Sequence, residues 1–280
     1  MVKRFTMLHI LLFFLTICTT LTAGMLQKGI NPIAEPWRFY QGLPFALTLM
    51  TILMAHELSH FFAALRHNTE ATLPYFIPAP SIIGTFGAFI KMKSPILTRT
   101  ALIDIGASGP LAGFLVSLAA SAAGLTFSDV VPRPPGGAEM ELGDSLLFWA
   151  LTKIIFGKNI PEGFDVLLNP VAFAGWIGLF ITAMNLLPIG QLDGGHVAYA
   201  VWGTATNRLS RVLVAALVAL GIFFWPGWLV WALFLTVTGL GHPPVYYRET
   251  PLPTSRRRVA AVSLVIFVIT FMPAPFNVNF

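Results

Sequence analysis

Residues 43–66 read LPFALTLMTILMAHELSHFFAALR, and this stretch decides the fold. It is long enough to cross a bilayer as a helix, which takes about 20 predominantly apolar residues. The predicted span, from about Leu43 to Leu65, nevertheless carries His56, Glu57 and His60. Ionisable side chains within a membrane are costly and are usually functional. The stretch therefore predicts both a membrane protein and a functional site inside the membrane.

The composition of the whole chain agrees with this interpretation. Of its 280 residues 56% are hydrophobic and only 10% are charged, whereas soluble domains carry about 25% charged residues. The net charge is +5, but Lys and Arg lie in short clusters between apolar runs. Such clusters are typical of topology signals, so we expect a lipid bilayer and no nucleic acid as partner. Cys18 is the only cysteine, so any metal site must use histidines and carboxylates.

We predict an all-α polytopic membrane protein with about six to seven transmembrane helices. The predicted spans cover residues 5–23, 43–65, 103–125, 170–188, 209–225, 228–240 and 259–272, of which the last two are short. Residues 1–24 form an N-terminal anchor, with a signal peptide as the alternative. Residues 43–203 form the catalytic membrane core, and residues 204–280 form C-terminal transmembrane helices.

Two connecting segments have distinct characters. Residues 81–94 are apolar but interrupted by glycines and too short to cross, so we expect a β-like loop that dips into the membrane. Residues 126–167 contain Pro, Gly and an excess of acidic residues, which indicates an external cap. With the N-terminus inside, the predicted inner segments carry the basic residues Lys3, Arg4, Arg66, Lys91, Lys93, Arg99, Arg208, Arg211, Arg248, Arg256, Arg257 and Arg258.

The spacing of His56 and His60 predicts a metal site. Residues four apart lie on the same face of a helix, so both imidazoles can bind one ion. Zinc accepts imidazole nitrogen and carboxylate oxygen, and catalytic zinc keeps three protein ligands. Glu57 is the candidate general base, although spacing alone does not place it on the histidine face. The alternative to a metal site is that two histidines and a glutamate fall by chance on a buried helix.

Asp193 is the candidate third ligand. It lies between Pro188 and the pair Gly194-Gly195, which interrupt the helix and permit close approach of the backbone. The alternative is a turn aspartate that caps the next short helix. A glutamate as third ligand is a further alternative. The candidates Glu139, Glu141 and Glu162 fall in the predicted external loop, which lies on the wrong side of the membrane for His56.

The motif HELSH at residues 56–60, together with NLLPIGQLDGG at residues 185–195, resembles the site-2 protease family of M50-like intramembrane zinc metalloproteases. A Gly-Pro segment at residues 109–113 is also similar, so the resemblance covers roughly residues 43–203. It implies one Zn²⁺ held by His56, His60 and Asp193, with Glu57 activating water. It also implies that Asn185 positions the substrate or stabilises the oxyanion, and that residues around Gly84, Phe86 and Gly87 offer a strand edge to the substrate.

From these features we expect a zinc-dependent intramembrane endopeptidase that cleaves a transmembrane segment of a membrane-protein substrate. We also expect a multi-pass protein of the bacterial inner membrane with a cytoplasmic N-terminus. The alternatives are a polytopic metal transporter and an inactive relative that binds transmembrane segments without cutting them. His196 is interpreted as a structural hydrogen-bonding residue rather than a ligand, and Asp104 as a complement to its helix dipole.

Overall fold

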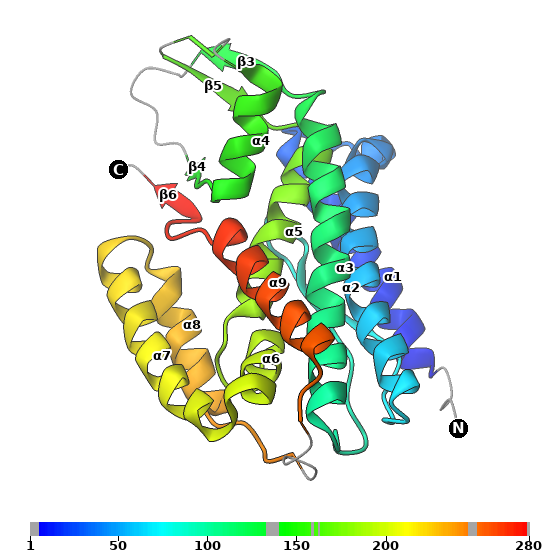
Figure 1. Ribbon diagram of the computed structural model, residues 1–280. Helices are drawn as coiled ribbons and strands as arrows, with labels where there is room; N and C mark the ends of the chain where they lie inside the picture. Colours follow the sequence, from blue (N-terminus) through cyan, green and yellow to red (C-terminus); the bar gives the residue numbers. More distant parts are fainter. Residues whose placement is uncertain (1–5, 133–139, 158–159, 162, 246–250, 279–280) are drawn as a thin grey trace. The chain divides into compact units, whose positions relative to one another are not determined.

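The computed structural model describes residues 6–132, 140–157, 160–161, 163–245 and 251–278 (Figure 1). The longer helices are α1 (Met7–Gln27), α2 (Leu43–Arg66), α3 (Arg99–Leu125), α5 (Pro170–Leu186), α7 (Thr206–Phe223) and α9 (Thr254–Thr270). The shorter helices are η1 (Pro36–Gly42), α4 (Leu146–Phe156), α6 (Asp193–Trp202), η2 (Gly203–Ala205) and α8 (Gly227–Thr238). The strands are β1 (Tyr75–Pro78), β2 (Thr85–Phe89), β3 (Asp129–Pro132), β4 (Met140–Leu142), β5 (Phe164–Leu167) and β6 (Phe276–Val278).

The chain folds into two compact units. Unit 1 comprises Met1–Pro95, Leu111–Val131 and Val166–Leu179, and unit 2 comprises Ile96–Pro110, Pro132–Asp165 and Phe180–Phe280. Helices α3 and α5 contribute residues to both units. Each unit is described by itself below.

A helix forms at each place where a span was predicted. Within the described residues, four helical stretches are long and apolar enough to cross a membrane, namely Met7–Gln27, Pro36–Arg66, Arg99–Leu125 and Asp193–Phe223. The apolar helices α5 and α8 are shorter, and α9 begins with three arginines. The chain therefore has the helices of a polytopic membrane protein, whereas the predicted total of six to seven spans stays a prediction.

The all-α description needs correction. The described strands form three two-stranded sheets, β1 with β2, β3 with β5 and β4 with β6. The β-like character predicted for residues 81–94 is confirmed over β2, whose partner β1 lies in a Pro-rich stretch before it. The predicted cap contains α4, because Ser145 accepts a hydrogen bond from the Phe148 N–H and starts an apolar helix there.

In unit 1 the β1–β2 hairpin packs on α1. The His9 ring stacks on Tyr75 with 4.0 Å between ring centroids, and Phe13 meets Phe76 edge-on. Gly84 has φ +81°, and a Cβ at this position would lie 2.5 Å from the Thr19 carbonyl oxygen. Only glycine combines this backbone conformation with such a close approach. Gly84 therefore fixes the hairpin turn against α1.

Small residues join α3 to α5 within unit 1. A Cβ on Gly175 would lie 2.5 Å from the Ser121 backbone nitrogen, and one on Gly124 would lie 2.1 Å from the Ala172 nitrogen. Trp176 and Ala172 are fully buried at this contact. Close backbone approach through small residues is the usual way in which helices pack in membranes, where lipid offers no hydrophobic drive for association.

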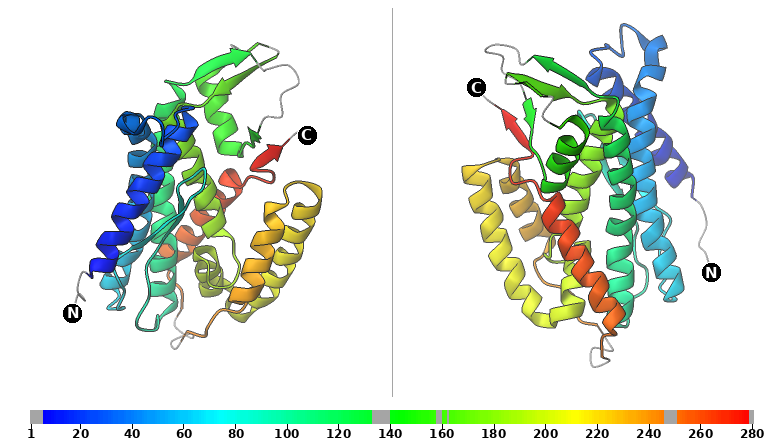
Figure 2. Two further views of the ribbon diagram at one scale, coloured as in Figure 1. Left: turned by 180° about the vertical axis from the view of Figure 1, so that it is seen from behind. Right: turned by 45° about the horizontal axis from the view of Figure 1, so that its top comes forward.

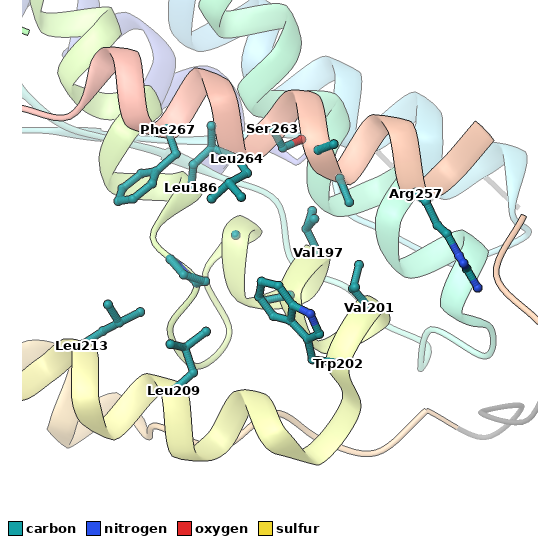
Figure 3. A pocket seen from close by; sticks show the side chains of 15 residues that line it. Leu186, Val197, Val201, Trp202, Leu209, Leu213, Arg257, Ser263, Leu264 and Phe267 are labelled. Carbon is teal, nitrogen blue, oxygen red and sulfur yellow. The ribbon is translucent and has the colours of Figure 1, made fainter. Parts of the chain in front are cut away.

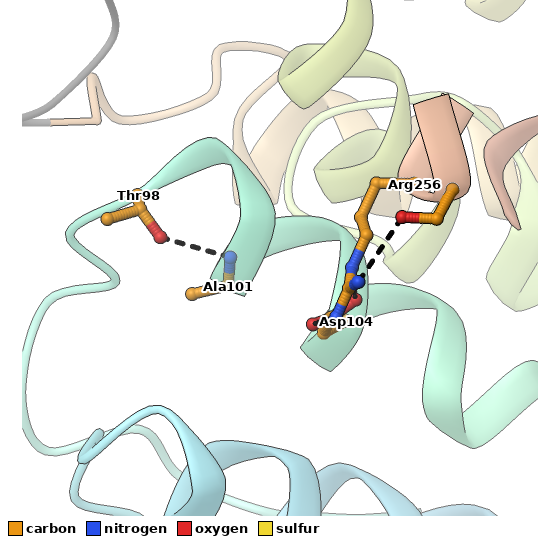
Figure 4. Close-up of polar contacts among 5 residues, drawn as sticks. Thr98, Ala101, Asp104 and Arg256 are labelled. Carbon is orange, nitrogen blue, oxygen red and sulfur yellow. Dashed lines mark hydrogen bonds and ion pairs between the residues drawn. The ribbon is translucent and has the colours of Figure 1, made fainter. Parts of the chain in front are cut away.

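In unit 2, α7 and α8 form an antiparallel hairpin and lie side by side in both views (Figures 1 and 2). Trp228 of α8 is fully buried, and its indole N–H donates to the Pro273 carbonyl oxygen at 2.7 Å. The Arg256 guanidinium of α9 donates two hydrogen bonds to Asp104 of α3, at 3.0 and 2.8 Å (Figure 4). Asp104 thus forms a bidentate ion pair, which the interpretation as a helix-dipole residue missed.

The α3–α5 contact makes a prediction about stability. Gly124→Ala should lower the free energy of unfolding by about 1–3 kcal/mol, because the added methyl group meets backbone that cannot rotate away. Ala119→Val is the matched control, since Ala119 is exposed on the same helix. Reversible unfolding in mixed detergent micelles measures both variants. Equal stability of Gly124→Ala and the wild type would show that this contact is not tightly packed.

Candidate metal centre

Helix α2 presents both histidines and the glutamate on its buried face. Between Leu43 and Arg66 the buried residues repeat with the helical period. His56, Glu57 and His60 belong to this face and are only 4%, 6% and 6% exposed. Glu57 therefore shares the buried face of the histidines, which spacing alone did not establish. Three ionisable side chains are thus packed inside unit 1 on a helix that is otherwise mostly apolar.

The two imidazoles converge. Their rings meet edge-on with 4.8 Å between centroids, and the two Nε2 atoms lie 3.1 Å apart. Two nitrogens that bind one zinc ion tetrahedrally at about 2.05 Å would be roughly 3.3 Å apart. The separation in the structure therefore fits a shared metal ion. Both Nε2 atoms must be unprotonated to bind a metal, so each ring would then carry its proton on Nδ1.

Gly113 of α3 makes room for the first histidine. A Cβ at this position would lie 3.1 Å from His56 Nδ1 and 3.4 Å from His56 Cβ. The absence of a side chain lets α3 pack directly on the imidazole and leaves that ring little freedom to turn. Gly113 thus permits the close helix approach that small residues typically allow in membrane proteins.

Asp193 lies in unit 2 as the first residue of α6. Leu192 takes the N-cap position and has extended backbone angles. A Cβ on Gly194 would lie 2.0 Å from the Leu186 carbonyl oxygen, and one on Gly195 would lie 2.4 Å from the Gly190 carbonyl oxygen. The first turn of α6 therefore packs directly on the chain that precedes it. This confirms that the two glycines serve close backbone approach.

A second glycine of α3 packs on the same turn within unit 2. A Cβ on Gly106 would lie 3.1 Å from the Asp193 carbonyl oxygen and 2.8 Å from His196 Cβ. The backbone position of Asp193 is thereby held from two sides, by Gly106 and by the loop before α6. A residue with any side chain at position 106 would displace this turn.

His196 forms a hydrogen-bonded pair that fixes its tautomer. His242 Nδ1 lies 2.7 Å from the Pro243 carbonyl oxygen, and His242 Nε2 lies 2.6 Å from His196 Nδ1. A carbonyl only accepts, so His242 carries its proton on Nδ1 and accepts from His196 at Nε2. His196 then has its lone pair on Nε2. The expected structural hydrogen bond of His196 is confirmed, but its partner lies 46 residues away and was missed.

The environment of His242 favours the neutral form that this arrangement needs. Burial lowers the pKa of His242, and the hydrogen bond to the Pro243 carbonyl opposes this effect. The Tyr199 ring stacks on the imidazole with 4.2 Å between centroids, and the His242 backbone N–H donates to Asn207 Oδ1. His242 is thus a structural residue of unit 2.

The structure also gives the positions of the other residues that the sequence predicted for the site. Asn185 is half-buried near the end of α5 in unit 2. In unit 1 Gly84 is buried, Gly87 has φ +101°, and the Phe86 side chain is 75% exposed. Of the alternative glutamate ligands, Glu139 and Glu162 lie outside the described residues, and Glu141 lies in β4.

Comparison with known proteins identifies the family. The model of Peptidase family M50 matches residues 44–225. The chain is 33% identical over 242 residues to "Probable zinc metalloprotease EGY1, chloroplastic" of Arabidopsis thaliana, a match that covers 82% of this chain and 43% of that protein. It is 32% identical to "Probable zinc metalloprotease EGY2, chloroplastic" of the same plant, over 84% of this chain and 42% of that protein.

A third relative, "Probable zinc metalloprotease EGY1, chloroplastic" of Oryza sativa subsp. japonica, is 30% identical over 82% of this chain and 40% of its own length. The chain therefore spans about two fifths of these curated relatives. Their names give no support to a bacterial inner membrane. The family match includes both predicted motifs, residues 56–60 and 185–195. With its buried HELSH helix and its Asp193 turn, the chain belongs to Peptidase family M50.

Proposed function

We propose that this chain is a zinc-dependent intramembrane endopeptidase that cleaves transmembrane segments of other membrane proteins. The observation that carries the proposal is the pair of histidine Nε2 atoms 3.1 Å apart, buried together with Glu57 on a helix long and apolar enough to cross a membrane. Three buried ionisable groups on such a helix are expensive unless they bind an ion or one another. A metal ion satisfies both imidazoles at once.

Asp193 completes the ligand set in this proposal. Its support comes from its position as the first residue of α6, directly before two closely packed glycines. Gly113 packs on His56 in unit 1, and Gly106 packs on Asp193 in unit 2. The family match supports the same assignment, because both motifs lie inside it. One carboxylate and two imidazoles leave one position open for water or substrate, as catalytic zinc requires.

Glu57 acts as the general base. When bound, zinc supplies Lewis acidity that lowers the pKa of water from 15.7 to about 7. The Glu57 carboxylate takes a proton from the attacking water and returns it to the leaving amine. Its burial on the same face of α2 as the two histidines shields the carboxylate from bulk water. The Asn185 amide is the proposed donor to the oxyanion.

The substrate segment must unwind before it can be cut, because a helical amide is hydrogen-bonded and sterically hidden. The β1–β2 hairpin offers a way to hold the unwound strand. Among the described strands β2 has β1 as its one partner, so its outer edge can pair with an extended peptide. The exposed Phe86 ring lies on this strand and would contact the apolar side chains of a transmembrane segment. We place the N-terminus on the cytoplasmic side.

Substitution of the base tests the reaction. Glu57→Gln should keep the zinc content of the wild type and lower the cleavage rate of a model transmembrane substrate by roughly 10²–10⁴-fold. Glu35→Gln is the matched control, because Glu35 is a partly exposed glutamate of unit 1 that pairs with Arg38 at 2.7 Å. Cleavage in proteoliposomes and zinc analysis provide the two readouts. A Glu57→Gln enzyme that cuts at the wild-type rate would exclude Glu57 as the base.

Substitution of the third ligand tests the metal site. Asp193→Asn should weaken zinc binding by at least about tenfold, because a neutral amide replaces a charged oxygen ligand. Asp104→Asn is the control, since Asp104 is a carboxylate of the same unit that already pairs with Arg256. Competition with a zinc chelator measures the affinity. Unchanged affinity in Asp193→Asn would remove this residue from the ligand set.

The transporter alternative makes an opposite prediction. A transporter would move zinc across liposomes at the same rate with Glu57→Gln, because no general base is needed. The inactive-relative alternative predicts binding of the model substrate without any cleaved product. The wild-type cleavage assay separates both alternatives from the protease.

A further inference from the structure

Unit 2 contains a cavity of about 520 Å³ that the proposed reaction does not use (Figure 3). Its walls come from α6, α7, α9 and the end of α5. This volume lies within the range of about 300–1,000 Å³ that is typical of small-molecule sites. The cavity lies wholly inside one unit, so its walls form a single packed set of elements.

The cavity is long and almost entirely apolar. Along α9 its lining extends from Arg257 to Phe267, which is about 15 Å of helix. Between these ends the walls are formed by side chains such as Val197, Val201 and Leu264. Of the described lining residues only Ser263 carries a hydroxyl, and its Oγ already donates to the Val259 carbonyl oxygen. A ligand of this cavity must therefore be apolar over most of its length.

Among the lining residues that the structure describes, the one charged residue lies at the beginning of α9. Arg257 is exposed, and Figure 3 shows its guanidinium at the opposite end of the cavity from Phe267. The neighbouring Arg256 is engaged with Asp104, whereas Arg257 has no ion pair with any residue that the structure describes. The cavity thus combines a cation at one end with an apolar channel, which complements an anionic head on an apolar chain.

The place of Arg257 in the sequence selects among such ligands. Arg256, Arg257 and Arg258 immediately precede the apolar part of α9, and basic clusters in this position lie where lipid phosphates lie. A phosphate at Arg257 would leave its acyl chain pointing along α9 into the apolar channel. A transmembrane protein segment has no such anion as a rule. Both the charge and the polarity of the cavity therefore favour a lipid.

We propose that this cavity binds one acyl chain of an anionic phospholipid, with the lipid phosphate held by Arg257. Gly194 also lines the cavity and follows Asp193 directly in the chain. A bound chain would thus touch the first turn of α6. The binding proposal itself is independent of the proposed protease activity, because it rests on unit 2 alone.

The experiment compares two lipids with identical acyl chains, phosphatidylglycerol and phosphatidylcholine. The full chain is purified in detergent, offered each lipid, and analysed by native mass spectrometry for bound lipid. Both lipids carry a phosphate, but the choline cation of phosphatidylcholine offsets its charge, whereas phosphatidylglycerol keeps a net charge of −1. The wild type should therefore retain phosphatidylglycerol roughly tenfold more strongly, as expected for one charged donor that meets a net anion. Arg257→Gln should abolish this preference. Arg258→Gln should keep it, because Arg258 does not line the cavity.

A second variant tests the position of the chain. Ala261→Phe places a ring inside the lining and should reduce retention of both lipids, while its melting temperature in detergent reports that the variant is folded. Equal retention of the two lipids by the wild type would overturn the proposal, as would equal behaviour of the two arginine variants. Displacement of bound phosphatidylglycerol by a model transmembrane peptide, with no lipid preference left, would instead assign the cavity to a protein segment.

Discussion

The burial of three ionisable side chains on α2 is the constraint on which the rest of the structure depends. His56, Glu57 and His60 are each at most 6% exposed. An uncompensated charge or an unpaired polar group in such surroundings costs several kcal/mol. The two Nε2 atoms meet at 3.1 Å, so the imidazoles can share either one proton or one metal ion. The second arrangement uses the lone pairs of both rings, as the proposed zinc site requires.

The buried side chains of such a site need neighbouring helices that pack closely without large side chains of their own. Glycine provides them on α3, where Gly113 faces His56 in unit 1 and Gly106 faces the turn of Asp193 in unit 2. A methyl group at either position would press on an imidazole ring or on the backbone of α6. The same helix continues toward its C-terminal end with Gly124 against α5. Close packing along α3 thus serves the surroundings of His56 and the stability of unit 1 together.

The parts of the site that sequence could predict are those set by local spacing. His56 and His60 are four residues apart on an uninterrupted helix, so their convergence follows from helical geometry. The break at Asp193 was likewise visible, because Pro188 and two glycines are strong local signals. The position of Glu57 on the buried face needed the structure, since it depends on which side of α2 is covered.

Contacts between residues far apart in the chain could not be predicted from local sequence. The Arg256–Asp104 ion pair joins residues 152 positions apart, and the His196–His242 pair joins residues 46 apart. In neither pair does the sequence around one residue indicate which residue it contacts. Strand β1 was missed for a related reason, because its prolines argue against helix while its pairing depends on β2. Helix α4 was missed because the acidic and Pro-rich character of the surrounding loop masked a short apolar run.

In the first turn of α6, four consecutive residues each have a distinct structural role. Asp193 opens the helix, Gly194 and Gly195 pack on the preceding loop, and His196 is held by His242. At the other end of α6, Arg99 donates to the Ala200 carbonyl oxygen at 2.6 Å. A ten-residue helix is too short to be stable alone. These contacts hold both ends of α6, which is the rigidity that Asp193 would need as the proposed metal ligand.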